Sequence, residues 1–485
     1  MSGGAEGKKV AIVGGGVAGL AAAHRLQALA ASSGESLQIV LFERDRVFGG
    51  KVQSRWSKAG LLIERGPDSF LTRKPALLDL IGEIGLTDQL IATQGSALSS
   101  FIYRKGRMRR LPPGMGALVP ADLFRFLRSD LLSPGGRLRV LRDLWLSPPP
   151  DGDLSLRELI GPRLGDEFLT QVAEPLIAGI HSAEPEQMSV AATVPGLLTL
   201  LTRDRSLIRG ARRQMRARSG PTSPPFMSLR DGMGSLVSAL EGQLGAVERR
   251  LGSEVQAIAK AEGRLRLRAK GADMGGKEEL VDAVVLATPA HLATGLALPL
   301  WPDLAQELSE IPAHPVLTIT YAYLRPEIEQ VLPGHGWLVP RGEGTWMRGA
   351  TVMTNKWQGR SRSSELVSIR AFLGGAGQAA LNEVADDRLI EQVADEVGRL
   401  LAVSARPIEA TVERVLEGNP EYRVGHIERV ARIDQLLDDI PNLAVAGASY
   451  RGIGLPDVVR SGQEAAARVW KGLHGREGEA DTVIR

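Results

Sequence analysis

The segment from residue 8 to residue 51 constrains the fold more than any other part of the chain. An apolar stretch, KKVAIV, runs directly into Gly14-x-Gly16-x-x-Gly19, and small and apolar residues at helical spacing follow. A second apolar stretch, Leu37–Phe42, ends at an acidic residue. A strand, a glycine turn, a helix and a second strand that ends in an acid are typical of a dinucleotide-binding unit.

Each part of this motif has a physical task. The first glycine permits a tight turn, the second lets the backbone approach a pyrophosphate, and the third lets the helix pack closely on the strand. Free N–H groups at the helix start favour a phosphate there. The residues predicted to contact the cofactor in this turn are Gly14, Gly15, Gly16, Val17, Ala18 and Gly19. Glu43 is expected to accept hydrogen bonds from ribose hydroxyls, and Arg44 follows it.

Three further segments resemble parts of a nucleotide site. A Gly49-Gly50-Lys51 turn can bring backbone and one cation to a phosphate, and Gly66-Pro67-Asp68-Ser69 comes soon after it. Near the C-terminus, the apolar stretch 443–446 precedes Gly452-Ile453-Gly454-Leu455, and a helix is expected over Gln463–Gly472. A helix N-terminus there could stabilise negative charge on a reduced ring. The glycine motif alone does not separate FAD from NAD.

At this point the chain resembles the flavin amine oxidase superfamily. Within it, the chain is similar to the oxygen-dependent oxidases of haem synthesis that act on protoporphyrinogen IX or coproporphyrinogen III. The resemblance covers roughly residues 8–474 and is carried by VGGGVAGL, FERDRVFGGK, ERGPDSFL, EPLIAGIHSAEPEQMSV, LRDGMGSLVSAL, VVLATPAH, PEYRVGH and AGASYRGIGLPDVVRSG. It implies a Rossmann-like α/β FAD-binding domain interleaved with a mixed-sheet substrate domain and a helical lobe.

The resemblance also implies an activity. The expected reaction is the six-electron oxidation of a porphyrinogen to the porphyrin, with FAD as cofactor and O2 as acceptor, giving H2O2. The cofactor supplies the redox chemistry, and the protein supplies orientation and charge. We therefore predict no side chain as a general base. The family pattern adds the backbone of Val255 as an adenine contact. It also implies a tryptophan at a position where this chain has Val415.

Two histidines lie in family-like segments. His181 follows Ala178-Gly-Ile, and either a pocket role or a structural role is open for it. For His426 we expect a hydrogen bond that fixes a loop, because a lone histidine is more often structural than catalytic.

Length and composition agree with several lobes. The chain has 485 residues, more than a usual single domain. The predicted FAD-binding domain comprises 8–75, 226–295 and 408–474, with a helical lobe at 76–225, a mixed-sheet substrate domain at 296–407, and flexible tails at 1–7 and 475–485. Helices are expected over Pro75–Ile84, Ala121–Leu132, Gly136–Leu146, Leu154–Ile160, Asp166–Ile177 and Leu229–Leu244.

Charge, cysteine content and hydropathy argue against several classes of protein. With 59 basic and 56 acidic residues, the balance is too small to imply nucleic acid. The chain contains no cysteine, which excludes disulfides, thiolate metal sites and a cysteine-linked flavin. No signal-like N-terminus and no run of 18 apolar residues is present. We expect a cytoplasmic protein.

Basic clusters suggest anionic partners. Residues 104–110 hold Arg104, Lys105, Arg107, Arg109 and Arg110, which could bind substrate carboxylates or simply form a solvated hairpin. Ser100 stands where many relatives place an arginine. The arginine-rich stretch Arg203–Arg218 and the interleaved apolar and basic residues of 115–150 suggest peripheral contact with anionic lipid at most. A solvated loop, or a transient contact with the next haem-pathway enzyme, is the alternative for the arginine-rich stretch.

Rival functions remain open. Another flavin oxidase acting on amines should need several aromatic residues around the flavin, and the chain has only five tyrosines. A carotenoid desaturase would share the nucleotide fold. A scaffold without activity is the remaining alternative, and the intact glycine turns argue against it.

Overall fold

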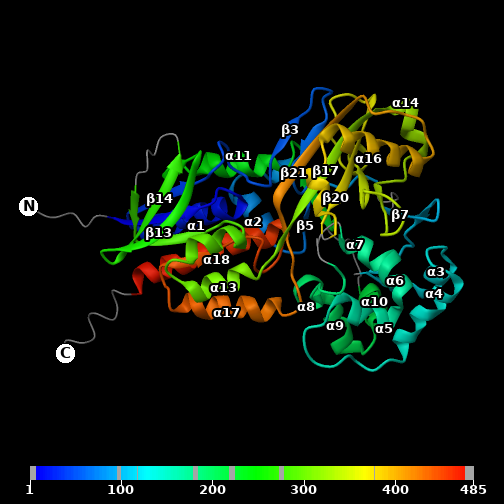
Figure 1. Ribbon diagram of the computed structural model, residues 1–485, viewed down its shortest axis with the longest axis horizontal. Helices are drawn as coiled ribbons and strands as arrows, with labels where there is room; N and C mark the ends of the chain where they lie inside the picture. Colours follow the sequence, from blue (N-terminus) through cyan, green and yellow to red (C-terminus); the bar gives the residue numbers. More distant parts are fainter. Residues whose placement is uncertain are drawn as a thin grey trace, which may run out of the picture.

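The computed structural model describes residues 7–95, 100–116, 118–178, 184–217, 224–271, 278–375 and 377–475. Figure 1 shows three bodies: a nucleotide-binding part that carries both termini, a second β-rich part, and a helical lobe beside it. Segments distant in sequence build each body, which agrees with the expected interleaving. The α/β class that the sequence predicts is confirmed.

A five-stranded parallel sheet forms the centre of the nucleotide-binding part. Its order is β12-β2-β1-β16-β22, and β1 pairs with β2 from Lys8↔Leu37 to Val13↔Phe42. The strands are short. The three in the middle, β2, β1 and β16, are apolar and buried over their last four residues, as expected where both faces are covered, whereas the edge strand β12 is mostly charged. Their bounds are β1 Lys8–Val13, β2 Leu37–Phe42, β12 Val247–Arg250, β16 Ala283–Leu286 and β22 Leu443–Val445.

Helices pack on one face of this sheet and a second layer covers the other. Val10 and Ile12 of β1 face the helices, while Ala11 and Val13 face the second layer. The helices on the first face are α1 Val17–Ser33, α2 Ala76–Glu83, α11 Gly234–Gln243 and α18 Leu455–His474. The second layer comprises β13 Ser253–Ala261, β14 Arg264–Gly271, β15 Glu278–Val281, α12 Ala290–Ala297, α13 Pro302–Ser309 and α17 His426–Asp438.

Small sheets connect this part to the rest of the molecule. The strands β3 and β4 form a hairpin, and β11 pairs with both β5 and β6. Their bounds are β3 Ser54–Trp56, β4 Leu62–Glu64, β5 Phe70–Leu71, β6 Leu90–Ala92 and β11 Phe226–Leu229, with a 3₁₀ turn at Thr87–Gln89.

A seven-stranded sheet forms the second body. Its order is β21-β17-β20-β19-β18-β7-β8, and α16 packs its apolar side against one face. The strands are β7 Ser100–Arg104, β8 Arg107–Arg110, β17 Ala313–Leu324, β18 Gly336–Leu338, β19 Gly349–Val352, β20 Leu366–Gly374 and β21 Glu409–Pro420. The helices are α14 Arg325–Ile328, α15 Met353–Lys356 and α16 Asp386–Leu401, with 3₁₀ turns at Glu329–Val331 and Ala379–Glu383.

The helical lobe has its own apolar core, formed by residues such as Phe126, Leu159, Phe168 and Leu197. The helix α5 begins at a capping box, in which Ser155 Oγ accepts from Glu158 N and Glu158 accepts from Ser155 N. The elements are α3 Leu123–Arg128, α4 Pro134–Arg139, a 3₁₀ helix Val140–Leu144, α5 Leu156–Leu164, α6 Asp166–Phe168, a π-helical turn Leu169–Ala173, α7 Glu174–Ala178, α8 Val190–Thr193, α9 Pro195–Asp204, α10 Leu207–Ala217, and strands β9 Met115–Gly116 and β10 Val119–Pro120.

Several expected boundaries are corrected. The predicted helix Leu229–Leu244 is wrong at its start, because Leu229 ends β11 and a turn with Gly232 at φ 93° precedes α11. The C-terminal helix begins at Leu455, before the predicted Gln463. Apolar spacing alone could not show that the glycine turn leads directly into that helix.

The sheet pairing also places two strand segments differently from the predicted ranges. The β7–β8 hairpin falls in the predicted helical lobe, yet β7 pairs with β18 of the seven-stranded sheet. The strand β21 falls in the predicted FAD-binding range, yet it pairs with β17 along its length. The division into lobes otherwise stays a prediction.

Candidate active site

The glycine turn follows the carboxyl end of β1, where ligands of parallel sheets bind. Gly14 has φ 109°, a conformation that side chains disfavour. A Cβ on Gly19 would lie 1.9 Å from the carbonyl oxygen of Gly14, so the helix α1 packs directly on the turn. These two glycines are therefore required by the chain itself.

Gly16 differs from its neighbours. It caps α1 with φ −72° and ψ −179°, which any residue can adopt, and a Cβ built there meets no atom within 4 Å. No side chain caps this helix end. The space beside Gly16 and the free N–H groups of the first turn suit a phosphate.

Glu43 lies at the end of β2 and is 8% exposed. Its Oε2 accepts from Gly15 N at 2.7 Å and its Oε1 accepts from Asp45 N at 2.9 Å. Burial raises the pKa of this carboxyl group, although both hydrogen bonds oppose that rise. A carboxylate offers further acceptor sites, so a ribose contact is compatible with these bonds. Arg44, beside it, is exposed.

The second glycine turn lies against the first. Gly49 N donates to Gly15 O at 2.8 Å, and Gly49 and Gly16 form a parallel bridge. A Cβ on Gly66 would lie 2.2 Å from Lys51 O, so the two predicted segments touch through backbone. The Lys51 ammonium donates to Gly418 O near the end of β21.

Asp68 joins the nucleotide-binding part to the seven-stranded sheet. Its Oδ2 accepts from Lys356 Nζ at 2.8 Å and from Trp357 Nε1 at 2.7 Å, and Ser69 Oγ donates to Oδ1 at 3.2 Å. Although burial opposes its charge, Lys356 and the other donors hold the pKa of Asp68 well below its usual range. The segment Gly66-Pro67-Asp68-Ser69 is thus an ordered turn that carries a fixed negative charge.

The C-terminal glycine unit reaches the same region. Gly454 caps α18, Leu455 is its first residue, and Ile453 lies in the preceding turn. A Cβ on Gly462 would lie 2.2 Å from Ala18 O, so the third turn of α18 packs directly on the first turn of α1. Gly452 has φ 131°. Neither helix has a side-chain cap at its N-terminus.

Buried aromatic residues fix this last loop. Tyr422 and His426 stack with ring centroids 3.9 Å apart, and Gly452 N donates to the Tyr422 hydroxyl at 2.9 Å. His426 Nε2 lies 2.8 Å from Tyr450 O. Burial lowers the pKa of His426, which keeps the ring neutral. The loop-fixing role expected of His426 is confirmed. That Tyr422 also fixes this loop was not predicted from the sequence, although Tyr422 lies in the PEYRVGH segment.

Other predicted residues have these positions. Val255 is buried in β13, whose first residue Ser253 donates its N–H to Glu43 O at 2.8 Å, so this strand starts beside the acid. Val415 is buried in β21 and pairs with Val316. His181 lies outside the described residues.

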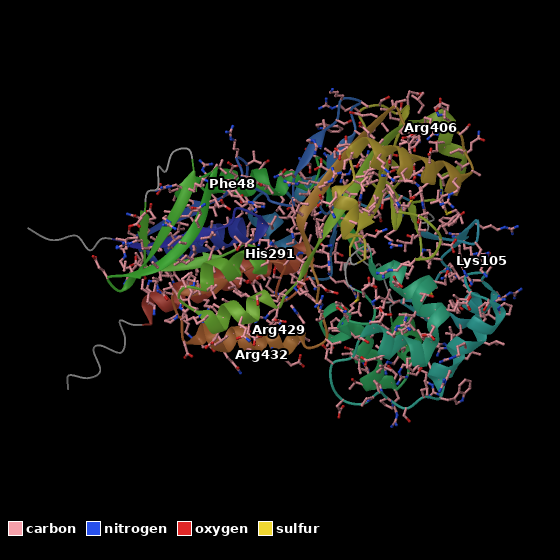
Figure 2. All side chains as sticks on the ribbon, viewed as in Figure 1. Phe48, Lys105, His291, Arg406, Arg429 and Arg432 are labelled. Carbon is pink, nitrogen blue, oxygen red and sulfur yellow. The ribbon has the colours of Figure 1, made fainter. Side chains whose placement is uncertain are left out.

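Two basic side chains of the β7–β8 hairpin, Arg104 and Arg109, donate hydrogen bonds to other parts of the protein. Arg104 is buried and donates to Leu131 O at 2.5 Å and to Glu167, and Arg109 donates to Asp130. Lys105 lies at the exposed tip of the β7–β8 hairpin (Figure 2). Arg104 is therefore buried and bound within the protein, not part of a solvated hairpin as the alternative expected, and Arg109 also has a protein acceptor.

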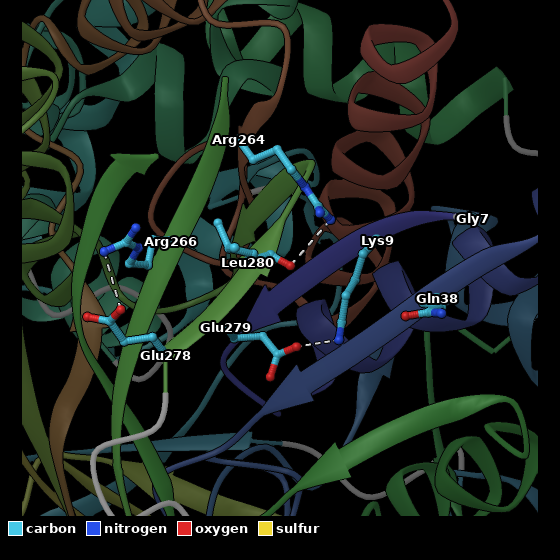
Figure 3. A pocket seen from close by; sticks show the side chains of 8 residues that line it. All are labelled: Gly7, Lys9, Gln38, Arg264, Arg266, Glu278, Glu279 and Leu280. Atoms are coloured by element: carbon cyan, nitrogen blue, oxygen red, sulfur yellow. Dashed lines mark hydrogen bonds and ion pairs between the residues drawn. The ribbon is translucent and has the colours of Figure 1, made fainter. Parts of the chain in front are cut away.

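A surface recess of about 570 Å³ lies away from these turns. Lys9 and Gln38 line it from the amino ends of β1 and β2, the opposite edge of the sheet from the glycine turn. Its charges are paired: Arg266 with Glu278 at 3.3 Å, and Lys9 with Glu279 (Figure 3). We assign no function to this recess.

Comparison with known proteins decides the family. Residues 17–470 match the family of flavin containing amine oxidoreductases. The chain belongs to this family. It is 31% identical to a coproporphyrinogen III oxidase of Propionibacterium freudenreichii, over 94% of this chain and 90% of that protein. It is 28% identical to the Staphylococcus aureus protein of the same name, over 95% and 99%.

Solved structures agree. A protein of Exiguobacterium sp. 255-15, provisionally named a protoporphyrinogen oxidase, superposes with a TM-score of 0.84 at 32% identity, covering 96% of this chain and 99% of that one. Putrescine oxidase, at TM-score 0.68 and 17% identity over 96% and 98%, shares the fold. The chain is an FAD-dependent oxidoreductase. The open space at Gly16 and the uncapped N-terminus of α1 fit a dinucleotide cofactor.

Proposed function

We propose that this protein oxidises a porphyrinogen to the corresponding porphyrin in haem biosynthesis, with coproporphyrinogen III as the first substrate to test. The observation that carries the proposal is end-to-end similarity, at 27–31% identity, to relatives named coproporphyrinogen III oxidase. The segment GPDSFL forms the turn at 66–69 and β5, the segment GIGLPD leads into α18, and Lys74, which follows the first segment, donates to Asp457 of the second. A chloroplast protoporphyrinogen oxidase of Arabidopsis thaliana is 27% identical, so protoporphyrinogen IX is the second substrate.

The electrons and protons of the proposed reaction balance between the porphyrinogen and O2, so no protein side chain has to gain or lose a proton overall. Six electrons and six protons leave the porphyrinogen, and three O2 molecules accept them to give three H2O2. FAD, when bound, supplies the acceptor for each pair of electrons. The residues that would hold the nucleotide are those of the glycine turns and Glu43, and the turn at 66–69 and the N-terminus of α18 would lie toward the reacting ring.

Electrostatics in the site favour a reduced, electron-rich cofactor. The N-terminus of α18 carries a partial positive charge, and no side chain caps it. Asp457, in the first turn of that helix, is buried and accepts from Lys74 Nζ at 2.5 Å, so its negative charge is compensated. Preorganised charge of this kind contributes to catalysis because it needs no rearrangement during reaction.

The decisive test is turnover by purified, yellow protein. Coproporphyrinogen III and protoporphyrinogen IX are supplied side by side, first without oxygen and then with it, and porphyrin fluorescence and peroxide are recorded. Fluorescence and peroxide that rise together above the autoxidation blank support the proposal. Protein that retains FAD but gives no rise with either substrate would overturn it, and amines and carotenoid precursors would then be tested. A folded, FAD-poor variant serves as the matched blank.

We also propose that the enzyme works in the cytoplasm and contacts anionic lipid only peripherally. In the described part of the chain, no helix has the length and apolar character needed to span a bilayer. Phe124, Leu138 and Trp145 of the helical lobe are 67%, 65% and 75% exposed, and Arg128 lies over the Phe124 ring. Absence of cosedimentation with anionic liposomes at low salt would overturn the lipid contact.

A further inference from the structure

Arg370 is a buried cation that forms no ion pair and no hydrogen bond shorter than 3.4 Å within the described residues, and its guanidinium carbon lies 5.2 Å from the centre of the Phe372 ring. Its residue is 2% exposed, in the centre of β20. Its Nη2 reaches Arg65 O and Thr318 Oγ1 only at 3.4 Å, and its Nε has no acceptor among the described residues. Hydrogen bonds of this type usually measure about 2.9 Å, so both contacts are weak.

Other buried arginines of this chain have closer hydrogen-bond or ion-pair partners than Arg370 has. Arg163 binds Asp143 at 2.9 Å, Arg104 binds Glu167, and Arg360 donates to Leu229 O, Arg230 O and Ser228 Oγ. Arg370 forms no ion pair within the described residues. Three carboxylates lie close enough for their charge to act on Arg370, and each has another partner. Asp68 pairs with Lys356, Glu413 pairs with Arg55, and Glu64 accepts a hydrogen bond from Met233 N. Burial lowers the pKa of Arg370.

The face of the sheet that carries Arg370 is polar, although it is covered. Residues paired across strands share a face, and Arg370 pairs with both Thr320 and Thr351. Thr318, Thr320 and Ser368 are almost fully buried, and Ser368 Oγ has no partner among the described residues. The opposite face, with Ile319, Tyr321 and Ile369, packs on the apolar side of α16. The polar face lies toward the turn at 66–69, through the contact with Arg65.

We propose that Arg370 binds a negatively charged oxygen group of a bound ligand, between the polar face of the seven-stranded sheet and the turn at residues 66–69. A guanidinium group presents parallel N–H donors that match two oxygens at once. Two sources offer this chemistry, and the second rests on the proposed function: the anionic reduced flavin, or a propionate carboxylate of the porphyrinogen. Either would provide the acceptor that the chain itself does not.

The experiment compares Arg370→Met and Arg370→Lys with Arg414→Met. Arg414 lies on β21, which β17 separates from β20. It is on the opposite face and pairs with Asp386, so its loss removes a charge outside the proposed site. For each purified protein we would measure the unfolding of the apoprotein, the Kd for FAD, the midpoint potential of the flavin, and the Kd for coproporphyrin III by fluorescence. None of these readouts requires turnover.

We expect the Arg370→Met apoprotein to be as stable as the wild type or more stable, because a poorly bonded buried charge is removed. If the flavin is the ligand, its midpoint potential falls and FAD binds about tenfold or more weakly. If a propionate is the ligand, the Kd for coproporphyrin III rises about tenfold or more, while the Kd for FAD stays unchanged. Arg370→Lys should restore part of either effect, because it retains the charge without the planar fork.

Changes below twofold in FAD affinity, flavin potential and coproporphyrin affinity, relative to Arg414→Met, would overturn the inference and leave Arg370 a structural residue. Loss of FAD caused by an unfolded Arg370→Met apoprotein would also count against it, if Arg370→Lys, which folds, behaves as wild type. An altered flavin potential in a protein inactive on porphyrinogens would overturn the proposed function alone.

Discussion

The substitution Gly16→Ala should weaken FAD binding at the glycine turn without changing the stability of the apoprotein. The new methyl group meets no protein atom within 4 Å, and the backbone of Gly16 is already in a conformation open to alanine. Alanine is a poorer N-cap than glycine by about 0.5–1 kcal/mol, and it gains back about 0.4–1 kcal/mol because the unfolded chain has fewer conformations. The apoprotein should therefore be as stable as the wild type within about 1 kcal/mol.

Cofactor binding should respond quite differently. If the pyrophosphate lies against Gly16, the methyl group takes up space that the ligand needs, and overpacking of this kind costs about 1–3 kcal/mol. That cost corresponds to roughly 5- to 150-fold weaker FAD binding. Apoprotein stability is measured by urea unfolding and affinity by FAD fluorescence titration. Gly82→Ala, an exposed change in α2 that also meets no atom, is the matched control and should leave affinity unchanged. Gly16→Ala protein that binds FAD within twofold of wild type would refute the reasoning.

Three further perturbations have definite signs. Gly19→Ala should destabilise even the apoprotein by about 1–3 kcal/mol, seen by urea unfolding, because its Cβ would lie 1.9 Å from Gly14 O; an unchanged midpoint would contradict this. Asp143→Ala should cost about 3–5 kcal/mol, because Asp143 is fully buried and binds Arg163; the double change with Arg163→Met should cost less, and an equal or larger cost would argue against a stranded charge. His426 has a pKa lowered by burial from 6.5, so the unfolded chain binds more protons in acid and stability falls as pH drops below about 6.5. His426→Gln should flatten that part of the stability profile, and an unchanged slope would show that another group titrates there.

The nucleotide-binding unit could be predicted because its signals are local. The turn at Gly14 and the close packing at Gly19 depend on residues five positions apart, and the acid after β2 follows within the same strand–helix–strand unit, 28 residues after Gly15. The structure has the strand Leu37–Phe42 with the predicted bounds. The C-terminal helix was predicted too short because its first turn, with Pro456, lacks regular apolar spacing, although proline is well suited to a first turn.

Pairing between distant strands could not be predicted in the same way. The hairpin β7–β8 and the strand β21 join one sheet although about 300 residues separate them. Nothing in the local pattern of Ser100–Arg104 indicates that β18 is its neighbour. Domain ranges drawn along the sequence therefore fail where a sheet collects strands from several places.

The polar face of the seven-stranded sheet explains why site residues there escaped sequence reasoning. In β20, LVSIRAFLG, nearly every residue is buried, so alternation between apolar and polar side chains does not report exposure. A buried strand with a serine and an arginine on one face is costly unless another group satisfies them. Ser368 Oγ and Arg370 Nε are two such groups on this face of β20, and we propose that a ligand satisfies the arginine. The guanidinium of Arg370, which has only long hydrogen bonds and no ion pair within the described residues, and the open space at Gly16 are therefore the two features on which our binding proposals rest.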